Sequence, residues 1–107
     1  MMIYDGETEI EVLEINENSV PDFVACTAKD LIVKGRVVDL VAWNILAVMK
    51  MNQVAVITKS SCETKGVKVV FIPYYSEVED EDVGETNIAI CWRILRFSNI
   101  VFKGQPN

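Results

Sequence analysis

Residues 86–97 read Thr-Asn-Ile-Ala-Ile-Cys-Trp-Arg-Ile-Leu-Arg-Phe, and this stretch decides the fold class. One alternating set of its residues is large and apolar, namely Ile88, Ile90, Trp92 and Ile94. The set between them consists of Ala89, Cys91, Arg93 and Leu95. Successive side chains of a strand point to opposite faces, so a period of two predicts a long strand with one face in the core.

Working outward from this strand, the sequence predicts further strands and two helices. The expected strands cover residues 8–15, 31–33, 53–59, 67–75 and 100–102. A helix is expected over 36–51, and a second, short one begins at Pro21, because proline suits the first helical position. We therefore expect a single α+β domain over 1–107. Its architecture would be a two-layer sandwich, with a four- or five-stranded sheet covered either by one long helix or by one long and one short helix.

The expected helix over 36–51 has an apolar face and a mixed face. On a 3.6-residue period the apolar face holds Val38, Val41, Ala42, Ile45, Val48 and Met49. The opposite stripe holds Arg36, Asp39, Trp43, Ala47 and Lys50. Aromatic residues at partly exposed positions are typical of interfaces, although the sheet could equally cover them. The interface candidates are Trp43, Ala47, Tyr74 and Tyr75.

Composition excludes several function classes. The chain has 107 residues, a formal net charge of −6 and no histidine, which removes Ser-His-Asp and Cys-His catalysis and imidazole metal ligation. Three widely spaced cysteines form no disulfide framework and favour a reducing compartment. The sequence starts without a signal-peptide pattern, and its most apolar stretch, 37–51, is too short to span a bilayer. We expect a cytoplasmic protein that uses no cofactor, metal or membrane and is not an enzyme.

An acidic run follows the strand predicted over 67–75. It comprises Glu77, Glu79, Asp80, Glu81, Asp82 and Glu85. The simplest interpretation is a solvated hairpin loop whose charges oppose edge aggregation. Binding of Ca²⁺ or Mg²⁺ is an alternative, although the EF-hand spacing is not met. A third interpretation is docking on a basic partner protein.

Two further features have a functional and a plain structural interpretation. Lys34, Gly35 and Arg36 join the strand expected over 31–33 to the helix expected over 36–51. Backbone N–H groups at a helix start and two cations could bind an anion there, with Lys59 as a further candidate. The same residues could form an ordinary turn. Cys62 is expected in a loop, where a thiol needs a base or positive field to become nucleophilic, and only lysines are near. Cys26 and Cys91 lie in apolar patterns typical of a core.

The C-terminal part resembles a known family. Residues 66–73, Gly-Val-Lys-Val-Val-Phe-Ile-Pro, followed by an acidic turn and 84–90, Gly-Glu-Thr-Asn-Ile-Ala-Ile, resemble the final hairpin of the stage V sporulation protein S family, which is similar to the chromatin protein Alba. Residues 31–38, Leu-Ile-Val-Lys-Gly-Arg-Val-Val, look like the first strand and the helix start of an Alba domain. In an alternative match, residues 36–51 resemble the second helix of that domain. The resemblance covers 31–97.

The resemblance implies dimerisation through a sheet-and-helix surface, and nucleic-acid contacts on Lys34 and Arg36. The hairpin arm is basic in that family but acidic here, and a net negative charge disfavours phosphate binding. We therefore expect a non-catalytic protein-interaction or regulatory protein that forms a homodimer. The alternatives are an Alba-like nucleic-acid-binding protein and an acidic viral or phage inhibitor of a nucleic-acid-binding host protein.

Overall fold

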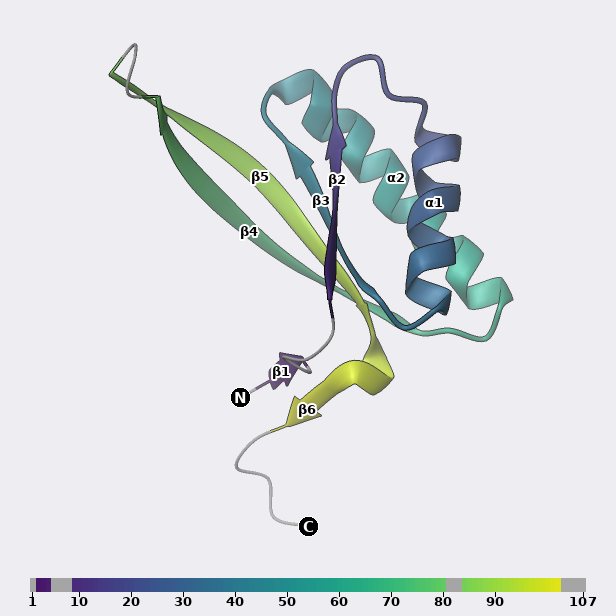
Figure 1. Ribbon diagram of the computed structural model, residues 1–107. Coiled ribbons are helices and arrows are strands. Elements are labelled where there is room, and N and C mark those ends of the chain that lie inside the picture. The colour runs from purple at the N-terminus through teal and green to yellow at the C-terminus, as the bar shows by residue number, and fades with distance from the viewer. Residues whose placement is uncertain (1, 5–8, 81–83, 103–107) are drawn as a thin grey trace.

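The computed structural model describes residues 2–4, 9–80 and 84–102 (Figure 1). Its strands are β1 (Met2–Tyr4), β2 (Ile10–Ile15), β3 (Val37–Ala42), β4 (Val69–Asp80), β5 (Glu85–Arg96) and β6 (Ile100–Phe102). Its helices are α1 (Pro21–Val33), α2 (Ile45–Thr64) and a 3₁₀ turn, Phe97–Asn99. No helix in these ranges is long and apolar enough to cross a membrane.

Four strands form one mixed sheet in the order β2-β3-β5-β4. β2 and β3 run parallel, as expected for strands joined by the crossover helix α1. β5 pairs antiparallel with both β3 and β4. β1 and β6 form a separate antiparallel pair. The α+β class and a four-stranded sheet with two helices, predicted from the sequence, are confirmed.

Both helices lie against the same face of the sheet (Figure 1). The core between the two layers joins alternate residues of the strands to the inner faces of α1 and α2. Its buried members are Ile15, Ala25, Ala28, Ile32, Val38, Leu40, Ala42, Ala47, Met51, Val54, Cys62, Val67 and Ile94. A smaller cluster around Val37 and Leu95 lies on the other face of the sheet.

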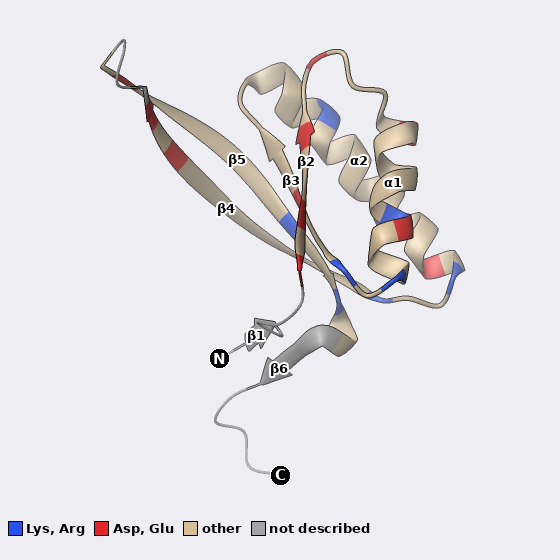
Figure 2. Ribbon diagram, viewed as in Figure 1, with Lys and Arg blue, Asp and Glu red and all other residues tan. Residues whose placement is uncertain are grey.

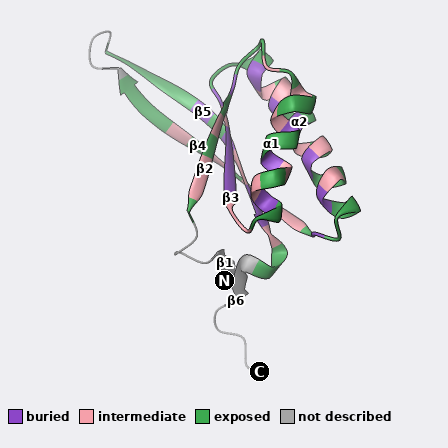
Figure 3. Ribbon diagram, turned by 45° about the vertical axis from the view of Figure 1, so that its right-hand side comes forward, coloured by how far each residue is buried: buried purple, intermediate pink, exposed green. Residues whose placement is uncertain are grey.

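The helix predicted over 36–51 is wrong. Val37–Ala42 is the central strand β3, buried along nearly its whole length (Figure 3), and α2 starts only at Ile45. A strand that is buried on both faces has an uninterrupted run of apolar residues. Such a run is compatible with the period of a helix as well as with that of a strand, so the pattern cannot distinguish them. The division into an apolar and a mixed face of that helix is therefore wrong as well.

Two predicted strands are turns of helix in the structure. Residues 31–33 form the last turn of α1, and 53–59 lie inside α2, which also takes in most of the loop expected over 60–66. Both segments are rich in valine and isoleucine, whose weak preference for strands is overridden by packing on the sheet. The remaining predicted strands and the helix start at Pro21 are confirmed, although β4 runs on to Asp80.

Each helix ends in the same way, on a Lys-Gly pair. Gly35 and Gly66 have φ values of +91° and +74°, the left-handed conformation that glycine adopts without steric cost. The Gly35 N–H donates to Ile32 O at 2.9 Å and the Arg36 N–H to Leu31 O at 3.0 Å. Gly66 and the residue after it repeat this pattern at the end of α2. These bonds define a Schellman motif, which turns the chain back toward the sheet as β3 and β4.

The β4–β5 hairpin extends well beyond the rest of the sheet as a two-stranded arm (Figure 1). β4 pairs with β5 over its whole length, from Val69 opposite Arg96 to Asp80 opposite Glu85. β3 pairs with β5 only between Ile90 and Ile94. Part of the acidic run expected to be a loop therefore lies in the arm, on β4.

The start of α2 offers a test of the corrected helix boundary. Asn44 is its N-cap, and its Oδ1 accepts a hydrogen bond from the Ala47 N–H at 2.9 Å. We expect Asn44→Ala to lower the free energy of unfolding by about 1 kcal/mol, because an orphan helix N–H loses its acceptor. Asn44→Asp keeps an acceptor and should leave stability unchanged or raised. Urea unfolding followed by circular dichroism measures both; equal stability of Asn44→Ala and the native protein would contradict this boundary.

Candidate protein-interaction surface

A strip of apolar side chains lies exposed where α2 meets the β4–β5 hairpin. We define the apolar strip by its exposed members, which are Trp43, Ile45, Met49, Val56, Tyr75, Ile88 and Ile90. Their exposed fractions lie between 39% and 80%. Tyr75 and Ile90 are cross-strand partners, so the hairpin contributes a continuous part of the strip.

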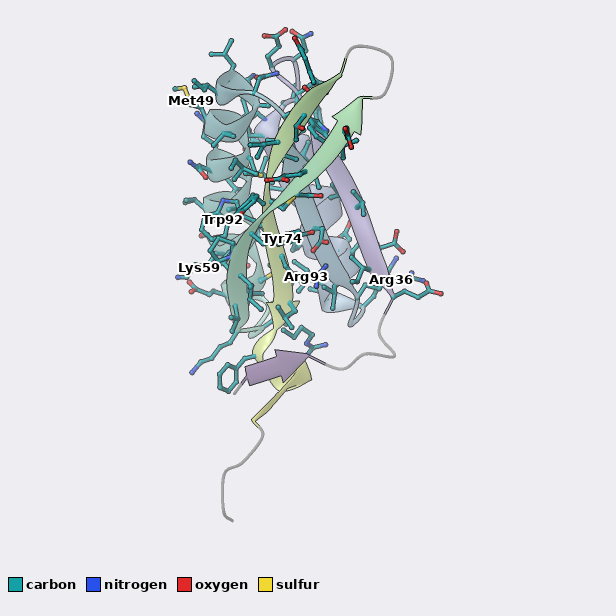
Figure 4. The ribbon with its side chains drawn as sticks, turned by 90° about the vertical axis from the view of Figure 1, so that its left-hand side faces the viewer. Arg36, Met49, Lys59, Tyr74, Trp92 and Arg93 are labelled. Carbon is teal, nitrogen blue, oxygen red and sulfur yellow. The ribbon has the colours of Figure 1, made fainter. Side chains whose placement is uncertain are left out.

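The contribution of α2 comes from its outer side. Buried residues such as Met51, Val54 and Thr58 mark the inner side of this helix, and Ile45, Met49 and Val56 lie roughly opposite them. The outward face of a surface helix normally carries polar residues. α2 instead has apolar residues on both faces through its first three turns. The labelled Met49 and Lys59 lie along one edge of the molecule, with Trp92 between them (Figure 4).

The strip is hollowed at two places between α2 and the hairpin. The larger hollow, about 380 Å³, is lined by Asn52, Ala55, Val56, Lys59, Phe71 and Trp92. In it the Trp92 Nε1–H donates to Asn52 Oδ1 at 3.2 Å, and the rings of Phe71 and Trp92 meet edge to face at 6.1 Å. The smaller hollow, about 180 Å³, lies between Ile45 and the strand residues Ile88 and Ile90. Both walls are largely apolar, which suits side chains of another protein.

The structure brings only two of the four interface candidates to this strip. Trp43 and Tyr75 belong to it. Ala47 lies on α2 and is fully buried, because the face of α2 that packs on the sheet is the one with Ala47, Met51 and Val54, opposite to the face predicted. Tyr74 faces the opposite side of the sheet, since neighbouring residues of a strand alternate between faces.

Tyr74 takes part in a polar cluster on the sheet face without helices. Asp39, only 4% exposed, accepts from Arg93 Nε at 2.8 Å, from Arg93 Nη2 at 2.8 Å and from the Tyr74 hydroxyl at 2.6 Å. The Arg93 guanidinium also lies 5.2 Å from the Tyr74 ring centre. Burial, and then the hydrogen bond to Asp39, raises the pKa of Tyr74 well above its usual value. The carboxylate is fully engaged, so this cluster stabilises the sheet and has no free acid or base.

The cation candidates lie at the opposite end of a helix from the one expected. Lys34, Gly35 and Arg36 follow α1, where the helix macrodipole is negative and favours cations over anions. Arg36 forms ion pairs with Glu9 and Glu11, and Lys59 with Glu63 at 2.7 Å. The predicted anion site at a helix N-terminus is therefore wrong.

The acidic candidates lie on the arm as far as the structure describes them. Glu77, Glu79 and Glu85 are exposed. Asp80 is the last residue of β4, and Glu81 and Asp82 lie outside the described residues. Among residues 9–79 and 84–98, no three cysteine or carboxylate side chains are grouped so as to hold a metal.

The cysteines differ from their predicted positions. Cys62 is not in a loop but buried in α2, and burial raises the pKa of its thiol, which disfavours the nucleophilic thiolate. Cys26 is exposed on α1 rather than in the core, whereas Cys91 is buried as predicted.

Two comparisons of the sequence with known proteins gave no relative. No protein-family model matches the sequence, and no curated protein matches it significantly.

Sequence reasoning missed the α2 part of the apolar strip. The sequence pattern places Ile45 and Met49 on the core face of the helix predicted over 36–51, and Val56 in a predicted strand. The spacing that could have indicated them is the series 45, 49, 52, 56 and 59, with steps of four and three residues. That spacing is typical of a helix seam that packs against another helix.

The Tyr74 hydroxyl gives a pH-dependent test of the polar cluster. At pH 7 we expect Tyr74→Phe to lower the free energy of unfolding by about 1–2 kcal/mol, because a hydrogen bond to a buried carboxylate is lost. The raised pKa means that the folded protein keeps a proton that the unfolded chain loses above about pH 10. The free energy of unfolding of the native protein should therefore fall toward that of Tyr74→Phe as the pH rises above about 10. A stability difference that stays constant from pH 7 to 11 would contradict the role of this proton.

Proposed function

We propose that this protein is a non-catalytic protein-interaction module that acts as a homodimer through the apolar strip. The observation that carries this proposal is the exposed area. Side chains of this size expose roughly 200 Å² each when free. Seven of them at 39% to 80% exposure leave about 800 Å² of apolar surface, close to what each partner buries in a standard complex.

The chemistry of the strip favours a second copy over a highly charged partner. Its seven members carry no charge, and Lys59 at the end of the larger hollow is already paired with Glu63. The strip also combines projecting side chains with hollows, so the side chains of one copy could fill the hollows of an identical second copy. Two-fold dimers use the same patch on both subunits, which makes such a surface suitable.

The polar groups support a non-catalytic function. The chain has no histidine, Asp39 is held by Arg93 and Tyr74, and Cys62 is buried. General acid–base or thiol catalysis needs a group that is both accessible and able to change its protonation state near neutral pH. The hollows of the apolar strip offer only Lys59 as a titratable side chain.

The family resemblance supports the dimer more than the alternatives. It implies a second helix between the second and third strands of the domain, and α2 lies between β3 and β4, although residues 31–38 are the end of α1 and the start of β3 and not a strand followed by a helix. It also implies dimerisation through a sheet-and-helix surface, which is the composition of the apolar strip. The nucleic-acid alternative is weakened, because Arg36 and Lys59 are paired with carboxylates. The inhibitor alternative depends on the exposed glutamates of the arm alone.

Substitution of the strip tests the proposal. We expect the native protein to elute with about twice the 12.0 kDa mass of one chain in size-exclusion chromatography with light scattering. Met49→Asp and Val56→Asp should each weaken dimerisation by about 100-fold or more, because a charge would be buried without a partner.

Phe23→Asp is the matched control. Phe23 is 75% exposed on α1, away from the apolar strip, and the same apolar-to-acidic change there should leave the dimer intact. A native protein that stays monomeric at millimolar concentration would refute the proposal. So would a loss of dimer in Phe23→Asp equal to that in Met49→Asp.

A further inference from the structure

The outer side of α2 carries a regular seam. Its positions are Ile45, Met49, Asn52, Val56 and Lys59, all exposed in the single chain. The steps between them are four, three, four and three residues. This is the a/d spacing of a coiled coil, which keeps one line of side chains facing a partner helix over four turns. In a dimer formed through the apolar strip, the simplest partner for this seam is α2 of the second copy.

The shape of the strip selects the direction in which two such helices pair. Ile45 and Met49 project at the N-terminal end of the seam, with Ile45 80% exposed. The larger hollow lies toward the other end, beside Val56 and Lys59. An antiparallel pairing sets the projecting residues of one copy against the hollow of the other. In a parallel pairing, Ile45 and Met49 of one copy would meet the same residues of the other, and the two Lys59 side chains would lie against each other.

The charge distribution selects the same direction (Figure 2). The N-terminal end of α2 lies near the arm, where Glu77 and Glu79 follow Tyr75 on one face of β4. Its C-terminal end lies at an end of the molecule where Lys29, Lys34, Lys65 and Arg96 outnumber Asp30 and Glu63, and we call it the basic end. Antiparallel pairing directs the acidic arm of each copy toward the basic end of the other, and complementary charge favours the correct register.

Asn52 lies at the midpoint of the seam. With the two-fold axis there, Ile45 lies opposite Lys59 of the second copy and Asn52 opposite its own counterpart, while Met49 comes within one residue of Val56 of the second copy. The Asn52 Oδ1 already accepts from Trp92 Nε1, so the amide is oriented by the hairpin. Lys59 is the last position of the seam, so Asn52 is the polar residue in its interior, and one polar residue inside an apolar helix seam fixes register at some cost in stability.

We infer that the protein forms a two-fold dimer in which the α2 helices pack antiparallel, with Asn52 at the axis and the arm of each copy directed toward the basic end of the other. This inference rests on the proposed homodimer and adds the direction and register of its helices. The association buries the seam and fills the larger hollow of each copy with Ile45 and Met49 of the other.

Disulfide trapping tests the geometry. The background is Cys26→Ser, which removes the exposed thiol and leaves the buried Cys62 and Cys91. A disulfide forms only where the two Cα atoms come within about 7 Å. In the antiparallel dimer, a mixture of Ile45→Cys and Lys59→Cys proteins should give a covalent heterodimer, and Asn52→Cys a covalent homodimer.

Ile45→Cys alone and Lys59→Cys alone are the matched controls. Their thiols would lie about 21 Å apart along the helices of an antiparallel dimer, at 1.5 Å per residue, and should give at least tenfold less covalent product than the mixture. Light scattering of the reduced proteins monitors the dimer separately. Efficient crosslinking of each single variant with itself would establish parallel pairing and overturn the inference. A dimer without any of these crosslinks would overturn it and leave the proposed function standing, whereas a monomer would refute both.

Discussion

Asp39 carries a charge at the centre of a strand that is buried on both faces, and the surrounding sheet satisfies that charge. A buried carboxylate without partners costs several kcal/mol. The cost is offset because β5 places Arg93 directly opposite Asp39 in the pairing register, and β4 places Tyr74 beside it. Slipping β5 by one residue would move Arg93 to the helix-covered face and leave Asp39 unpaired. The cluster therefore fixes the register of the three strands, and that register in turn brings Ile88, Ile90 and Trp92 to the side of α2.

The sequence predicts the elements whose patterns are unambiguous. The alternation in 86–97 and the β-branched run in 67–75 identify the β4–β5 hairpin, and Pro21 identifies the start of α1. The failures lie between them, where apolar residues occupy every face. Val37–Ala42 is buried on both sides and α2 is apolar on both sides, so neither shows the period that distinguishes strand from helix. The repeated Lys-Gly followed by a valine-rich segment, at 34–38 and 65–70, was a boundary signal, because glycine ends a helix in the left-handed conformation.

The interaction surface was predictable only in part for the same reason. Exposed aromatic residues at Trp43 and Tyr75 could be recognised from composition and local pattern. The contribution of α2 could not, because the outward direction of Ile45, Met49 and Val56 depends on where the helix begins. The helix begins nine residues later than predicted, at 45 instead of 36, and its inward face is the one that carries Ala47. The predicted anion site fails for the same reason, because Lys34 and Arg36 follow the end of α1 and do not lie at the start of a helix.

The edge strand β4 explains why association would proceed through side chains and not through backbone pairing. β4 has β5 on one side only, and an exposed strand edge is a template for adding further strands. Pro73 has no N–H and lies in the middle of β4, so it interrupts the donors that an added strand would need. Glu77 and Glu79 place like charges along the outer part of the same strand, which repel an identical edge. With the β4 edge blocked along both its inner and outer parts, a second copy that approaches the hairpin meets the side-chain surface between the hairpin and α2.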